Sequence, residues 1–132
     1  MKKKNTVLLL IIHIILLSSC DRQEHTYTSL NGSWRCDESH PVLGFRSYLT
    51  EMDHVVNKDS TYIISNFYNT GYNEFIFALL SENELIINKQ VITTLFVNGS
   101  GTYSNDYKNI YWEYEVDDGV QIINVTAKYS RK

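Results

Sequence analysis

The chain has very few of the residues that cross-link or interrupt a fold, with two cysteines, one proline and six glycines in 132 residues. Of its two cysteines, Cys20 lies in a segment that we expect to be processed. Cys36 then has no partner for an internal disulfide, so the fold must be stabilised by its core. A reactive thiol or an intermolecular bridge is one reading of Cys36, but we expect a small buried apolar side chain.

The sequence also lacks the motifs of common catalytic and cofactor sites. It has no nucleophile elbow, no phosphate-binding glycine loop and no Cys-x-x-Cys. Its histidines have no metal-type spacing such as His-x-x-x-His. Asp37, Glu38 and His40 form a compact acid–histidine cluster, which we expect to lie in the first loop beside Pro41 rather than to bind an ion. We therefore predict a protein that is not an enzyme, with no catalytic residue, no metal site and no cofactor.

The N-terminus has the order of charge and hydrophobicity of a bacterial secretory signal. Three lysines at positions 2–4 precede an apolar run, Val7–Leu17, that only His13 interrupts. The run is too short to span a bilayer, which needs about 20 residues. This order predicts a signal peptide over residues 1–19.

Leu17-Ser18-Ser19-Cys20 resembles the lipobox of bacterial lipoproteins. The resemblance implies that the chain is cut before Cys20 and that two or three acyl chains on this residue anchor it stably to a membrane. It also implies a place in the cell envelope, at the outer membrane, with the periplasmic and the outer face both open. An ordinary signal peptide followed by a chance cysteine is the alternative.

Removal of the signal leaves nine basic against fifteen acidic residues, a net charge of −6. An acidic surface disfavours nucleic acid and anionic membrane faces as partners. The polar segment 20–29 is typical of a tether, here a lipidated one, and residues 30–132 suit a single domain.

From Leu30 onward the pattern is all β. Apolar residues alternate with polar ones in Ile110–Val116 and again in Ile123–Tyr129, and Asp117-Asp118-Gly119 between them predicts a tight hairpin. Six further strands are expected at Ser33–Cys36, Tyr48–Asp53, Tyr62–Phe67, Glu74–Leu80, Glu84–Lys89 and Val91–Tyr103. In the last of these, Gly99-Ser100-Gly101 predicts a bulge or a corner.

Because the connecting hairpins are short, strands that follow each other in the sequence lie next to each other in the sheet. An antiparallel up-and-down meander of about eight strands closes into a barrel, which removes its exposed edges. The interior of such a barrel is either filled by side chains or just wide enough for one small ligand. We therefore predict one all-β, eight-stranded antiparallel barrel over residues 30–132.

Two resemblances agree with this fold. Gly32-Ser33-Trp34 resembles the Gly-x-Trp opening of lipocalin and calycin barrels, which implies that Trp34 closes one barrel end. It also implies that a basic residue of the last strand, Arg131 or Lys128, packs over that ring. Further segments are similar to a family of small lipoproteins from gut-dwelling Gram-negative bacteria: Ile64–Phe67, Gly99–Thr102, Asp118-Gly119 and Asn124–Tyr129. These are calycin- or lipocalin-like barrels of unknown function, and they offer no catalytic residue to transfer.

Two binding functions fit these observations. The chain has ten Tyr, five Phe and two Trp, and such rings can line a cavity for a small hydrophobic ligand. The residues expected to line it are Phe75, Phe77, Trp112 and Tyr114. The alternative is a filled barrel whose loops and outer surface bind an envelope protein or a glycan. A filled interior favours this alternative, and an open interior favours ligand capture.

Turn residues suggest two surface features. Four tyrosines fall in or beside expected turns and would form an amphipathic rim if they shared one barrel end. They are Tyr68, Tyr72, Tyr103 and Tyr107. Asp59-Ser60-Thr61 resembles a short acceptor motif for O-glycosylation in some gut bacteria, which suggests a sugar on this turn.

Overall fold

The structure is a computed structural model that describes residues 24–132. The expected signal peptide, Cys20 and the start of the tether lie outside the described residues. The elements are β1 (Gly32–His40), β2 (Gly44–His54), β3 (Thr61–Ser65), the short 3-10 turn η1 (Phe67–Asn69), β4 (Phe75–Ser81), β5 (Glu84–Ile92), β6 (Leu95–Tyr103), β7 (Asn109–Asp117) and β8 (Ile122–Arg131).

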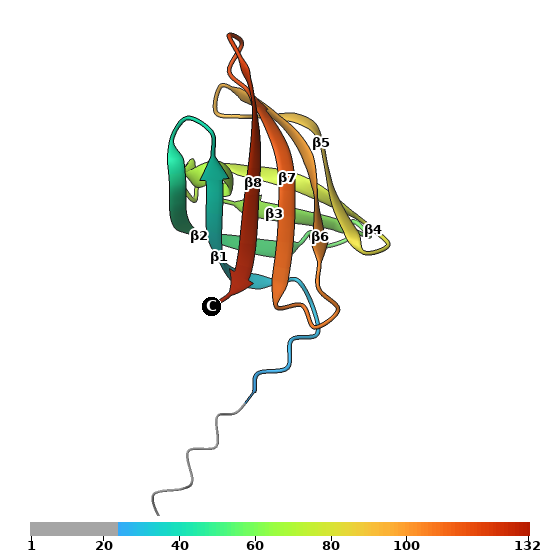
Figure 1. Cartoon of the computed structure of the whole chain (residues 1–132). Coiled ribbons are helices and arrows are strands. Elements are labelled where there is room, and N and C mark those ends of the chain that lie inside the picture. Colours follow the sequence, from blue (N-terminus) through green and yellow to red (C-terminus); the bar gives the residue numbers. More distant parts are fainter. Residues whose placement is uncertain (1–23) are drawn as a thin grey trace, which may run out of the picture.

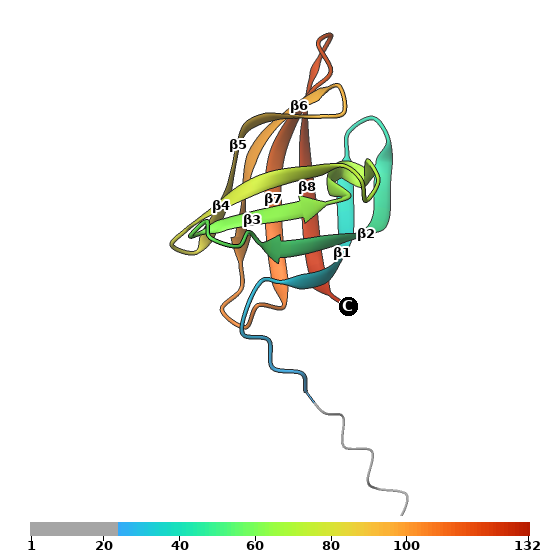
Figure 2. The same cartoon turned by 180° about the vertical axis from the view of Figure 1, so that it is seen from behind.

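The strands form a closed barrel in which every strand pairs with the next one along the chain. All pairs are antiparallel, and β8 closes the barrel by pairing with β1, where Trp34 lies opposite Arg131. β3 and β4 cross behind β7 and β8 at a steep angle (Figure 1), and the view from behind shows the same crossing (Figure 2). The predicted fold class, an all-β up-and-down barrel of eight strands, is confirmed.

Alternation of side chains explains why these segments form a barrel. In β7, four apolar or aromatic residues point inward and are buried: Ile110, Trp112, Tyr114 and Val116. The residues between them are exposed, as expected for a strand with one face toward a core and one toward solvent. The other strands add mostly aliphatic side chains to the same core, among them Met52, Ile64, Ile76, Leu85, Ile87, Val97 and Val125.

Three details differ from the predicted strands. β1 continues to His40, so the acid–histidine cluster belongs to a strand and not to a loop. The expected strand Val91–Tyr103 is split by a hairpin between Ile92 and Leu95. The bulge lies in β5, where the pairing moves from Ile87 to Gln90 with two residues between them, and not at Gly99–Gly101.

Gly99 and Gly101 have a different role, which is to make room for residues of the neighbouring strand β7. A Cβ atom on Gly101 would lie 2.5 Å from the indole of Trp112, and one on Gly99 would lie 2.5 Å from the Cα and Cβ of Tyr114. These are the residues opposite them on β7. The two glycines are therefore required by close approach, the other reason for glycine inside a strand.

Between Glu24 and Lys132, no helix has the length and apolar character needed to cross a bilayer.

Candidate functional site

One end of the barrel is sealed by Trp34 and Arg131. Trp34 is fully buried, and its indole N–H donates to the carbonyl oxygen of Leu30 at 3.0 Å. The guanidinium carbon of Arg131 lies 4.0 Å from the centre of the Trp34 ring, with the ring of Tyr27 4.6 Å away from it as well. Lys128, the other basic residue considered for this place, lies instead over the exposed ring of Tyr111.

Arg131 is held in this position by backbone carbonyl groups. Its Nε donates to Tyr107 at 3.0 Å and its Nη1 to Asn31 at 2.6 Å, while Nη2 donates to Ser29. The guanidinium thereby joins two segments that lie far apart in the sequence, the one before β1 and the loop between β6 and β7. Gly32 is adjacent, and a Cβ atom there would lie 2.9 Å from Arg131 Nη1.

The opposite end of β1 carries a buried charged network. Glu38 is completely buried, and its Oε1 accepts from Arg46 Nε at 2.8 Å and from Arg46 Nη2. Its Oε2 accepts from Tyr48 at 2.6 Å and from Tyr114 at 2.7 Å. Four donors on one carboxylate satisfy the condition under which a buried charge is tolerated.

Burial perturbs the ionisable groups around this carboxylate. It raises the pKa of the Cys36 thiol to about 12, so this buried cysteine stays protonated and is not a nucleophile. Burial, with the neighbouring tyrosines, also raises the pKa of Tyr48 well above its ordinary value, and burial beside Glu38 does so for Tyr114. These hydroxyls are therefore permanent donors to Glu38.

His40, at the end of β1, connects this network to the loop between β3 and β4. Its Nδ1 accepts from the backbone N–H of Val42 at 3.0 Å and of Leu43 at 2.8 Å, so its proton is on Nε2. Nε2 lies 2.7 Å from the hydroxyl of Tyr68 and donates to it. Tyr68 also stacks under the guanidinium of Arg46 at 4.6 Å.

The β3–β4 loop closes this end of the barrel with Phe67, a ring that no strand supplies. Phe67 is completely buried, 4.8 Å from the ring centre of Tyr114 and 6.1 Å from that of Trp112. We call residues 66–70 the plug. The side chain of Asn66 holds it in place, since its amide donates to the carbonyl of Leu49 at 2.6 Å and its oxygen accepts from Gly71 at 2.7 Å.

The plug has an unfavourable backbone. Within the plug, three of the residues 66–69 have positive φ angles, of 56° at Asn66 and 59° at Tyr68 and Asn69. Asparagine tolerates this region but tyrosine does so rarely, and such residues cost about 1–3 kcal/mol each. Strain of this kind persists only where surrounding contacts hold it, and here the contacts are those of Asn66, Phe67 and Tyr68.

Two buried polar groups beside the plug have no partner. The indole N–H of Trp112 and the hydroxyl of Tyr129 are buried without a hydrogen bond to any of residues 24–132. Their rings are neighbours, with centres 5.6 Å apart, and Trp112 also contacts Phe67. Groups of this kind in a native core call for an explanation, because an unmet buried donor costs about 1–3 kcal/mol.

The structure divides the residues expected to line a cavity. Trp112 and Tyr114 point into the barrel, next to the plug. Phe75 and Phe77 are 46% and 40% exposed and lie on the outside, so the prediction that they line the interior is wrong. The buried positions of β4 are Ile76 and Ala78, one residue away from the positions that the prediction placed inside.

The turn tyrosines do not share one end of the barrel. Tyr103 and Tyr107 stack on each other at 5.6 Å beside Arg131 at the sealed end, whereas Tyr68 belongs to the plug. The sequence reasoning missed Glu38, Arg46 and Phe67 as parts of one site. The signal for Glu38 was its spacing from Trp34, because alternation places both on the same face of β1.

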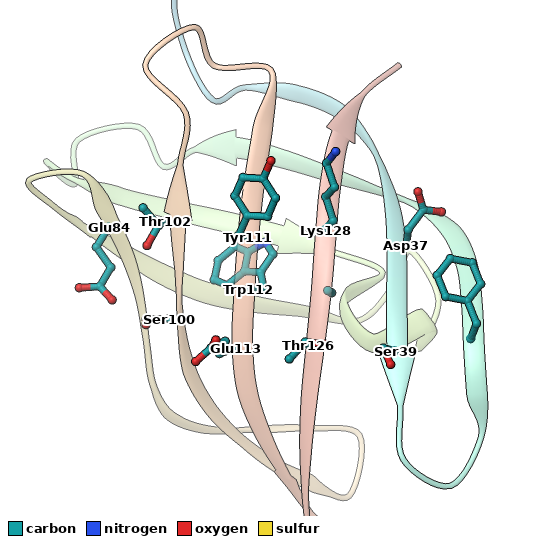
Figure 3. A pocket seen from close by; sticks show the side chains of 12 residues that line it. Asp37, Ser39, Glu84, Ser100, Thr102, Tyr111, Trp112, Glu113, Thr126 and Lys128 are labelled. Atoms are coloured by element: carbon teal, nitrogen blue, oxygen red, sulfur yellow. The ribbon is translucent and has the colours of Figure 1, made fainter.

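Hollows in the surface lie on the outer face of the barrel. One of about 550 Å³ is formed over β1, the start of β2 and β5–β8 (Figure 3). Another of about 990 Å³ lies over β5–β8. The buried core side chains and Phe67 lie inside the barrel. No group of three His, Cys, Asp or Glu side chains among residues 24–132 is arranged to hold a metal ion.

No family model matches the chain, and no curated protein matches it. Solved structures with the same architecture include a redesigned beta barrel, b11L5F_LGL, and EF1p2_mFAP2b bound to DFHBI. Both match with a TM-score of 0.56 and 12% identity over 78% of this chain, and over 91% and 94% of their own chains, respectively. At this level of identity the likeness shows the fold alone, which is that of a β-barrel.

Proposed function

We propose that the protein is a lipid-anchored barrel of the cell envelope that binds a small hydrophobic molecule in the interior, in the space that Phe67 occupies in this structure. The lipobox resemblance at Cys20 supports the anchor. A barrel of similar extent, EF1p2_mFAP2b, was solved bound to DFHBI, which supports small-molecule binding by this architecture.

The observation that carries the proposal is the plug. The ring of Phe67 is inserted by a strained loop, while the rings of Trp112 and Tyr114 that it contacts come from β7. Removing it from the core would leave the faces of Tyr114 and Trp112 free for another flat ring. The unpaired Trp112 N–H would favour a ligand that carries a hydrogen-bond acceptor.

A neutral fluorescent probe, N-phenyl-1-naphthylamine, tests this proposal with the Phe67→Ala variant. The substitution leaves a cavity that costs about 3–5 kcal/mol, part of which a bound ring recovers. We expect Phe67→Ala to bind the probe about tenfold more tightly than the wild type, with quenching of Trp112 fluorescence. Phe75→Ala removes an exposed ring and is the matched control. Equal binding by the two folded variants would overturn the proposal.

The second candidate function is binding of a partner at the outer surface of a filled barrel. It is favoured by one observation, that the two large hollows lie on the outer face of the barrel.

A further inference from the structure

The two hollows on the outer face form one continuous trough. Four residues line both of them: Glu84, Ser100, Glu113 and Thr126. Figure 3 shows Glu113 beside Thr126, with Ser100 on the neighbouring strand and Tyr111 farther along β7. We call this surface the outer trough. It extends around the barrel wall from β5 to Phe45 at the start of β2.

The strand register arranges the polar groups of the trough in rows. Ser100 lies opposite Glu113, and Glu113 lies opposite Thr126. In the next row, Tyr111 lies between Thr102 and Lys128. Every position of these rows is a hydroxyl, a carboxylate or an amine, so donors and acceptors stand side by side at the spacing of the sheet.

Most of these groups have no partner in the protein. No hydrogen bond or ion pair involves the side chains of Ser100, Glu113 or Thr126 within the described part of the chain. Asn98 and Glu115 bond to each other at 3.2 Å, and Asp37 is engaged by Arg35 and Ser47. The middle of the trough is therefore free to bond to a ligand.

The charge of the trough restricts the ligand. Four carboxylates line it, those of Asp37, Glu84, Glu113 and Glu115, against the two lysines Lys89 and Lys128. A net negative groove repels anions such as nucleic acids and phosphate headgroups. The ligand must be neutral or cationic.

Exposed rings complete the surface. Tyr111 is 54% exposed and Phe45 is 72% exposed, and both line the trough. The centre between them is polar, whereas a protein–protein interface places its apolar anchors at the centre. A partner with many hydroxyl groups and apolar C–H faces matches this arrangement better than a protein surface does.

We propose that the outer trough binds a neutral oligosaccharide. Hydroxyl groups of the sugar bond to Glu113, Ser100 and Thr126. A C–H face of one ring packs on Tyr111 in place of the Lys128 ammonium, which lies 5.7 Å from the centre of that ring. This inference rests on the second candidate function, binding at the outer surface, and names the ligand for it. It does not depend on the interior site.

Neutral hexasaccharides test the inference: β-1,4-glucose, α-1,4-glucose and β-1,4-N-acetylglucosamine oligomers titrated into the isotopically labelled protein. We expect amide shifts on β6, β7 and β8 with at least one of them. Glu113→Gln should weaken binding about tenfold or more, because a carboxylate acceptor is lost. Glu51→Gln, on the exposed face of β2 and outside the trough, is the matched control and should leave the affinity for the sugar unchanged.

The outcomes separate the two sites. Shifts confined to β6–β8 and lost in Glu113→Gln support the outer trough, whatever the naphthylamine probe does inside. Absence of shifts with all three sugars, or shifts that survive Glu113→Gln, overturns it. Shifts confined to the plug overturn it too, while supporting a ligand at the interior end.

Discussion

A single carboxylate, that of Glu38, organises the polar interior of this barrel. A buried charge is tolerated when its hydrogen bonds are complete, and here Arg46, Tyr48 and Tyr114 complete them. Loss of the carboxylate would leave Arg46, Tyr48 and Tyr114 without their common acceptor. The residue is therefore expected to matter far more to stability than any exposed acid of the same strand.

We expect Glu38→Gln to lower the free energy of unfolding by about 3–5 kcal/mol, since it leaves the Arg46 charge without its partner. Asp37→Asn, one residue away on the outer face, is the matched control and should change it by no more than about 1 kcal/mol. Urea denaturation measures both. Equal losses for the two variants would contradict the role given to Glu38.

The sequence predicted the core residues correctly where apolar side chains alternate strictly with charged ones. Alternation placed Trp112 and Tyr114 inside correctly, because both alternate with glutamates in β7. It failed at Phe75 and Phe77, since β4 is apolar on both faces and alternation then gives no phase. Glu38 was missed for the opposite reason, because a charged residue is normally assigned to the solvent side.

At the scale of elements, the hydrogen bond from His40 to Tyr68 joins the plug to the end of β1, beside the bonds of Asn66. His40 is neutral there, since its Nδ1 accepts two backbone N–H groups. Burial, followed by the charge of Arg46, lowers the pKa of His40 below its ordinary value of 6.5, while Glu38 acts in the opposite direction. Protonation would remove the acceptor that orders the β1–β2 hairpin.

The lowered pKa sets the sign of a pH effect. Below about pH 6.5 the unfolded chain takes up a proton that folded His40 resists, so stability present above this pH is lost as pH falls through the lowered pKa. We expect the melting temperature to fall between pH 7 and pH 5 by a few degrees more in the wild type than in His40→Asn. His54→Gln, at the exposed end of β2, should behave as the wild type.

Elements were easier to predict than their ends. All eight strands were identified, but the β5–β6 hairpin lay inside a single apolar run without a glycine or proline to mark it. Its turn uses Thr93 with a φ of 55°, a conformation that threonine rarely adopts. The plug could not be foreseen either, because positive φ angles at Tyr68 and Asn69 follow from tertiary contacts and not from local propensity.

At the scale of the whole molecule, β8 closes the meander by pairing with β1 over Thr126–Arg131. The contact between β4 and β5 is shorter, with Leu79–Ser81 opposite Glu84–Ile86, and beyond it the Gln90 side chain bonds the backbone of Phe77. This closure needs no disulfide, and Cys36 is buried and free. A short chain therefore gains a single core from consecutive hairpins alone.

The proposed anchor is tested on the full chain expressed in a Gram-negative bacterium that processes lipoproteins. We expect radioactive palmitate to label the wild type and to leave Cys20→Ala unlabelled, with the variant recovered in the aqueous fraction. Cys36→Ala is the matched control and should remain labelled, because its thiol is buried in the barrel. An unlabelled wild type would remove the envelope assignment.

The seam between β1 and β8 gives the molecule a direction. Trp34 and Arg131 are at the same end as the segment that leads back toward residue 24, and the C-terminus lies beside them (Figure 1). His40 and the plug are at the far end of β1. An acyl group at Cys20 would thus attach the barrel to a membrane on the side of Trp34 and Arg131. The plug would then be at the end of the barrel away from the bilayer, and the outer trough would lie on the wall between the two ends.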